Sequence, residues 1–230
     1  MDERFSEHRK NRPGGVVARD GPKPFITRVV KLAPDGSRVV VTSRRHRKGL
    51  GHLIVRSPSG LPARTTRSRL LVWAPRRLGW WIAVLFTIGS ALFAFASFLA
   101  TWPQVAPKLS NNVVLVGLSY FIGSLFFTTA AYLQVLETIN AGDSSGLYPN
   151  HAKLRRFRWF AWQPERIGYL ASTIQLVGTL FFNVNTGNAL ISGLGWIAQD
   201  IRIWTPDILG SACFLASSYL AVMEVCHRYW

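Results

Sequence analysis

The chain has 230 residues, 49% of them hydrophobic, and a formal net charge of +16. Residues 1–77 hold 19 of the 27 Lys and Arg residues and five of the 11 Asp and Glu residues, so they carry +14 of this charge. A basic first third before an apolar remainder argues against an ordinary soluble domain and indicates contact with an anionic surface. Cys213 and Cys226 lie in or beside an apolar stretch, which argues against a disulfide framework.

The first 77 residues are predicted to be a basic arm. Gly and Pro residues in 1–24 favour a flexible segment. Residues 25–32 and 38–42 are rich in β-branched residues and flank a Pro-Asp-Gly turn, which predicts a short β-hairpin. The basic run that follows has two interpretations, a lipid-headgroup or phosphate site and a solvated charge run that only fixes membrane orientation. The candidate headgroup residues are Arg44, Arg45, Arg47 and Lys48.

Four long apolar segments predict membrane-spanning helices. Residues 78–101 contain no ionisable side chain, and a helix of this length extends about 36 Å, enough to cross a hydrocarbon layer of about 30 Å. The other three segments are 113–136, 167 to about 183–188, and about 205–225. The predicted fold class is therefore an all-α membrane protein with a basic arm.

The distribution of positive charge predicts the orientation. Residues 1–77 and 138–166 are rich in Lys and Arg, whereas 102–112 and 189–204 hold one basic residue each. Basic segments stay in the cytoplasm, so both termini are expected there. The predicted parts are a cytoplasmic arm, a two-helix hairpin, a cytoplasmic connection, a second two-helix hairpin and a short cytoplasmic tail, with the bounds 1–77, 78–137, 138–165, 166–226 and 227–230.

An internal repeat relates the two hairpins. Residues 77–80 (RLGW) recur as 166–169 (RIGY), and 132–137 (YLQVLE) recur as 219–224 (YLAVME). Within each antiparallel hairpin, an Arg before the first helix and a Glu at the end of the second would lie at one depth. The sequence thus predicts interfacial ion pairs between Arg77 and Glu137 and between Arg166 and Glu224, or the same residues exchanged between the copies. Chance similarity of apolar runs is the alternative.

Small residues at matching mid-span positions predict close helix packing, because in lipid only close backbone approach gains dispersion energy. These residues are Gly89, Gly123, Gly178 and Gly210, and a ligand notch is the alternative interpretation. Gln175 lies within the third span, where it is predicted to donate an interhelical hydrogen bond rather than to contact a substrate.

Residues 123–127 (GSLFF), with 89–93 (GSALF) as a variant, resemble the YrhK-like domain of bacterial membrane proteins over about residues 70–226. The resemblance implies a multi-pass protein of the bacterial inner membrane and supplies no catalytic residues.

The residues themselves give little support for catalysis. All five histidines lie outside the spans, no zinc-type spacing occurs, and no Asp, Glu, Lys or Arg lies at the centre of a span. The sequence therefore predicts no enzyme, cofactor or metal site. We expect a scaffold or accessory protein that contacts anionic lipid through its arm, with a protein partner or second copy as a further expectation. The alternative is an oligomeric permeation protein for a small solute or ion. The arm has few aromatic residues for stacking, which argues against nucleic acid.

Overall fold

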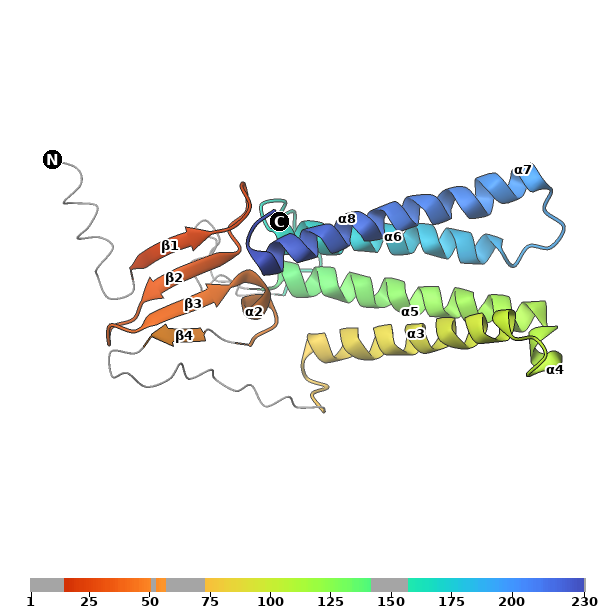
Figure 1. The fold of residues 1–230 in the computed structure, drawn as a ribbon, viewed down its shortest axis with the longest axis horizontal. Helices are drawn as coiled ribbons and strands as arrows, with labels where there is room; N and C mark the ends of the chain where they lie inside the picture. Colours follow the sequence, from red (N-terminus) through yellow and green to blue (C-terminus); the bar gives the residue numbers. More distant parts are fainter. Residues whose placement is uncertain (1–14, 51–52, 57–72, 142–156, 230) are drawn as a thin grey trace. The chain divides into compact units, whose positions relative to one another are not determined.

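The computed structural model describes residues 15–50, 53–56, 73–141 and 157–229. These residues are mostly helical, with a small sheet near the amino end of the chain (Figure 1). The chain divides into two compact units. The first unit consists of 1–72, 136–170 and 219–230, and the second consists of 73–135 and 171–218. The boundaries between units fall within three helices, so they differ from the predicted boundaries, which follow the membrane. Residues 1–14 and 57–72 of the predicted arm, and 142–156 of the predicted connection, lie outside the described residues.

The sheet of the first unit is antiparallel, with the order β1-β2-β3-β4. Strands β2 (Arg28–Leu32) and β3 (Arg38–Thr42) pair in the predicted hairpin, with Val29 opposite Val41 and Leu32 opposite Arg38. Val29 and Val41 are buried and form the centre of a small apolar cluster with Val16, Ile26 and Val39.

The β2–β3 turn is stabilised by side-chain hydrogen bonds that its sequence supplies. Asp35 Oδ1 accepts hydrogen bonds from the hydroxyl (2.7 Å) and backbone N–H (3.0 Å) of Ser37, and Gly36 adopts a φ of 77°. Such a positive φ is readily accessible to glycine. The Ser37 hydroxyl and backbone N–H hold the pKa of the Asp35 carboxyl below its usual value.

The two outer strands were not predicted. Strand β1 (Val16–Asp20) pairs with β2, so the prediction of a flexible segment is wrong for these five residues, and β4 (Leu53–Arg56) pairs with β3. Both pairings contain an irregularity, at 16–18 and at 38–39. Strands this short are stabilised by pairing with the neighbouring strand. Their few residues show too little alternation of apolar and polar side chains to predict a strand from the sequence alone.

In the described part of the chain, four helical stretches are long and apolar enough to cross a membrane: α3 (Leu78–Thr101), α5 (Val113–Ile139), α6 (Ile167–Asn188) and Trp196–Cys226, whose last part is α8 (Thr205–Cys226). The first three start where the spans were predicted, whereas the fourth stretch starts at Trp196, before the predicted start at about residue 205. Shorter helical segments are α2 (Ser43–Arg47), α4 (Pro107–Ser110), α7 (Trp196–Gln199) and a π-helical segment, Asp200–Trp204, that leads into α8.

In the second unit, α3 lies against α5, and α6 lies against α8, at paired glycines. The Gly89 carbonyl oxygen would lie 3.2 Å from a Cβ on Gly123, and the Gly178 carbonyl oxygen would lie 3.1 Å from a Cβ on Gly210. At both crossings the backbones therefore approach within a distance that only glycine allows without displacement.

Helices α5 and α6 meet through polar side chains in the second unit. Ser124 and Thr186 are hydrogen bonded through their hydroxyls at 3.0 Å, and both residues are buried. Gln134 Nε2 donates to Gln175 Oε1 at 3.3 Å. Each hydroxyl also donates to a carbonyl of its own helix, Ser124 to Phe121 and Thr186 to Phe182, so these contacts add polar interactions between helices whose hydroxyls are already satisfied.

Candidate functional site: an ion-pair site between the basic run and the helix ends

The first unit brings the basic run of the arm to the ends of three helices. Strand β3 leads directly into α2, and the Ser43 backbone N–H donates to the Thr27 carbonyl at 2.8 Å. Residues four apart on a helix share one face. Ser43 and Arg47 therefore point the same way, with Lys48 following at the end of the helix.

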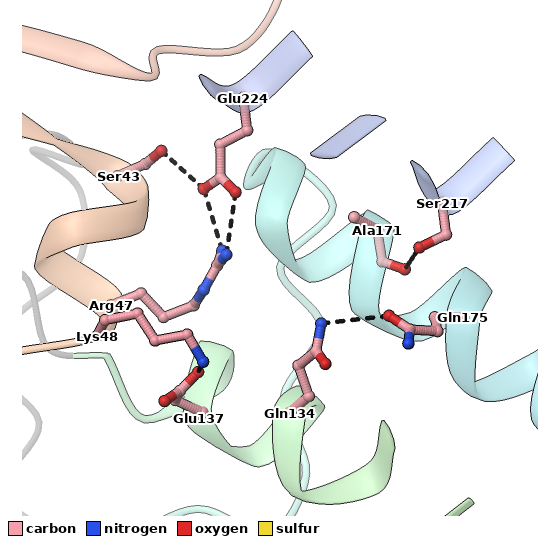
Figure 2. Close-up of polar contacts among 9 residues, drawn as sticks. All are labelled: Ser43, Arg47, Lys48, Gln134, Glu137, Ala171, Gln175, Ser217 and Glu224. Atoms are coloured by element: carbon pink, nitrogen blue, oxygen red, sulfur yellow. Dashed lines mark hydrogen bonds and ion pairs between the residues drawn. The ribbon is translucent and has the colours of Figure 1, made fainter. Parts of the chain in front are cut away.

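Glu224, in the last turn of α8, accepts hydrogen bonds from both Ser43 and Arg47. Figure 2 shows its two carboxylate oxygens facing the Ser43 hydroxyl and the Arg47 guanidinium. Arg47 Nη1 and Nη2 donate to Glu224 Oε1 and Oε2, each at 3.0 Å, and Ser43 Oγ donates to Oε1 at 2.7 Å. The side chains of Glu224 and Arg47 are only 2% and 12% exposed. A bidentate pair of this kind combines strong hydrogen bonds with a fixed geometry.

Gly168, in the first turn of α6, makes room for this contact. A Cβ on Gly168 would lie 1.6 Å from Arg47 Nη1 and 3.2 Å from Glu224 Oε1. The guanidinium thus lies directly against the α6 backbone. We call Ser43, Arg47, Gly168 and Glu224 the Glu224 site.

A second ion pair joins the next residue of the run to a different helix. Lys48 Nζ lies 2.6 Å from Glu137 Oε2 at the end of α5, with side chains 32% and 9% exposed. Glu137 and Glu224 are the two glutamates that the predicted internal repeat equates. Adjacent cations of the arm therefore bind carboxylates at the ends of two different helices.

These contacts differ from the pairs that the repeat suggested. Glu224 pairs with Arg47, and Glu137 pairs with Lys48. The pairing of Arg77 with Glu137 stays a prediction. Arg166 is buried and donates from Nη1 to the carbonyls of Ala141 (3.0 Å) and Thr138 (3.4 Å). Cations are favoured beside the carbonyls at a helix carboxyl end, which explains this alternative partner. Arg77 is the N-cap residue of α3 in the second unit.

One methyl group added at Gly168 is expected to destabilise the Glu224 site. In Gly168→Ala the new Cβ displaces the Arg47 guanidinium, and loss of a charged hydrogen bond costs about 1.5–3 kcal/mol. We expect faster hydrogen exchange in β2 and β3 of the detergent-solubilised protein. Gly195→Ala is the matched control, since a Cβ there would meet no atom within 4 Å. Equal exchange in both variants would contradict the assigned role of Gly168.

The carboxyl-terminal tail also contacts the sheet segment of the first unit. His227 Nδ1 lies 2.8 Å from Thr27 Oγ1, and the Tyr229 hydroxyl donates to the Lys23 carbonyl. Burial, and then the positive charge of Arg28, lower the pKa of His227 below its ordinary value of about 6.5. The folded state therefore favours the neutral imidazole.

This pKa shift predicts loosening of the tail in acid. Because the unfolded tail binds a proton more readily, the contribution of His227 is present above its ordinary pKa and is lost as the pH falls through its lowered folded pKa. The protection factors of the amides of residues 226–229, which compare the observed with the intrinsic exchange rate at each pH, should fall between about pH 7 and pH 5. His227→Asn should remove this dependence while tolerating the positive φ of 59°. An unchanged pH profile in that variant would contradict the prediction.

The contacts limit the predicted headgroup patch. Arg47 and Lys48 are engaged by glutamates, and Arg45 Nη2 donates to the Leu50 carbonyl at 3.1 Å. Arg44 is exposed. The run therefore supplies internal contacts that the sequence did not indicate, and Arg44 is its most accessible cation.

Among the residues that the structure describes, no group of three or more His, Cys, Asp or Glu side chains is placed to hold a metal ion. Comparisons with protein-family models, with curated proteins and with solved structures find no match. The resemblance to the YrhK-like domain stays a prediction.

Proposed function

We propose that this chain is a multi-pass protein of the bacterial inner membrane that acts as a non-enzymatic scaffold, with both termini in the cytoplasm. Its helices α3, α5, α6 and α8 cross the membrane, and the sheet is a rigid cationic platform at the cytoplasmic surface that contacts anionic lipid. The observation that carries this proposal is the Glu224 site. A buried bidentate ion pair fixes the sheet segment to a helix end, as a platform of defined orientation requires.

The proposal includes an origin of the bundle by duplication of a two-helix hairpin. The two glycine crossings support it, since Gly89 and Gly123 meet in the same manner as Gly178 and Gly210. A further support is the contact between Phe93 and Phe182, whose ring centroids lie 6.2 Å apart. Equivalent residues meet each other where a twofold axis relates two copies.

Lipid contact is tested with the full chain in nanodiscs of neutral or anionic phospholipid. We expect slower hydrogen exchange in β2 and β3 with anionic lipid, a difference that high salt reduces because surface attraction is screened. Arg44→Glu should weaken the effect, since Arg44 is exposed and lies outside the ion pairs. Exchange that is identical in both lipids would overturn lipid contact by the sheet.

Permeation is the second candidate, and the polar interface of α5 and α6 favours it. Gln134 and Gln175 are hydrogen bonded there, and in the described part of the chain the buried Asn183 Oδ1 has no partner. Solute flux into liposomes that is abolished by Gln175→Leu would support this function over the scaffold. Flux equal to that of empty liposomes supports the scaffold.

A further inference from the structure

The segment between α5 and α6 displays a cluster of exposed aromatic side chains in the first unit. Phe157, Trp159, Phe160 and Trp162 are 54%, 67%, 89% and 78% exposed. Their rings have little cover from the described residues: Phe157 and Trp159 contact each other edge-on at 5.1 Å, and Trp162 contacts Tyr169 at 6.1 Å. We call residues 157–162 the aromatic loop. Four large rings exposed within six residues indicate a surface that contacts a membrane or another protein.

The aromatic loop is fixed to the carboxyl end of α5. Asn140 Oδ1 accepts from the Arg158 backbone N–H at 2.7 Å, and Asn140 Nδ2 donates to the Arg158 carbonyl at 2.7 Å. Asn140 Nδ2 also donates to the Leu136 carbonyl within the last turn of the helix. One side chain thus satisfies both backbone groups of Arg158 and sets the loop beside a helix end.

The chemistry of the loop fits the boundary between hydrocarbon and headgroups. Trp and Phe rings gain by leaving water, and the indole N–H of Trp still finds polar partners at that depth. Arg158 lies among the rings, and the sequence just before the loop adds Lys153, Arg155 and Arg156. Cations at this level are attracted by anionic headgroups.

We propose that the aromatic loop inserts into the cytoplasmic interface of the lipid bilayer and anchors the first unit at that depth. This inference rests on the proposed membrane location of α5 and α6, because their ends bring the loop to the interface. It assigns lipid contact to a segment other than the basic arm. A helix end without interfacial side chains can shift along the membrane normal. Aromatic rings at the interface restrict this shift.

The test uses single cysteines in the full chain, after replacement of Cys213 by Ala and Cys226 by Ser. Phe160→Cys is labelled with an environment-sensitive fluorophore, and the protein is reconstituted in vesicles of phosphatidylcholine and phosphatidylglycerol that contain nitroxide lipids. We expect a blue-shifted emission and stronger quenching by a nitroxide near the headgroup than by one near the bilayer centre. Leu125→Cys on α5 and Pro34→Cys in the β2–β3 turn are matched exposed positions.

The two control positions separate this inference from the proposed function. The Leu125 label should be quenched most by the deep nitroxide. The Pro34 label, on a sheet that contacts headgroups without inserting, should be quenched less than the Phe160 label by the shallow nitroxide and not at all by the deep one. If Leu125 is not quenched, the membrane location itself fails. If Leu125 is quenched and Phe160 behaves like Pro34, only the loop assignment is overturned, and the aromatic cluster then belongs to a protein partner.

A positioning variant tests the role of Asn140. Asn140→Ala removes both hydrogen bonds to Arg158, so the label at Phe160 should show a broader depth profile and a smaller ratio of shallow to deep quenching. An unchanged ratio would overturn the assignment of Asn140 as the residue that sets the depth of the loop.

Discussion

Arg47→Met is expected to release the sheet from α8. Removal of the guanidinium leaves the Glu224 carboxylate, 2% exposed, with the Ser43 hydroxyl as its remaining partner at this site. Breaking a buried pair in this way costs about 3–5 kcal/mol, because one charge stays desolvated without its counterion. The apolar cluster of the sheet has two buried members, Val29 and Val41, so undocking should expose β2 and β3 to solvent. The expected acceleration of their amide exchange is about a hundredfold to several thousandfold.

The control for this variant lies in the same basic run. Arg44 is exposed, and Arg44→Met removes the same charge from the same short helix. We expect its exchange to remain within a few-fold of the original chain, since exposed charges contribute little to stability. Comparable acceleration in Arg44→Met and Arg47→Met would mean that the net charge of the arm, and not the Glu224 site, holds the sheet.

Gly178→Leu is expected to separate α6 from α8 in the second unit. Even a Cβ at Gly178 would lie 3.0 Å from the Cys213 Cβ and 3.2 Å from the Gly210 carbonyl oxygen. The rest of a Leu side chain has no space there unless the helices move apart. Overpacking of this kind costs about 1–3 kcal/mol. We expect a lower midpoint of unfolding in detergent, measured by the loss of helical circular dichroism.

Val177→Leu is the matched control, since Val177 precedes Gly178 on the same helix and is 41% exposed. It adds one methylene group to a position with open space, so its midpoint should equal that of the original chain. Val177→Leu and Gly178→Leu with the same midpoint would show that the glycine crossing does not limit the stability of the helix pair.

The long helices were predictable from the sequence for a definite physical reason. A stretch of more than 20 apolar residues has few ways to satisfy its backbone except as a helix, so charge and length alone place its ends. The starts of α3, α5 and α6 agree with the predicted spans, whereas the fourth apolar stretch starts at Trp196. The β2–β3 hairpin was predictable because the turn sequence and β-branched strands agree with each other.

The Glu224 site could not be derived in the same way. Its partners Arg47 and Glu224 are 177 residues apart, and no periodicity links an arm residue to a helix end. The repeat predicted pairs between the glutamates and the arginines that precede the helices, and the basic run had two interpretations, a headgroup or phosphate site and a solvated charge run. One available signal was the four-residue spacing of Ser43 and Arg47, which places a hydroxyl and a guanidinium on one face. Another was Gly168, which lies in the repeated segment 166–169 and in the structure makes room for Arg47.

Arg47 and Glu224 act as one unit that holds the sheet on α8. A double-mutant cycle of Arg47→Met and Glu224→Leu, read out by amide exchange in β2 and β3, measures this coupling directly. We expect the double variant to exchange more slowly than Arg47→Met alone, because removal of both charges leaves no unpaired buried ion. Additive effects, with the double variant the fastest of the three, would contradict it.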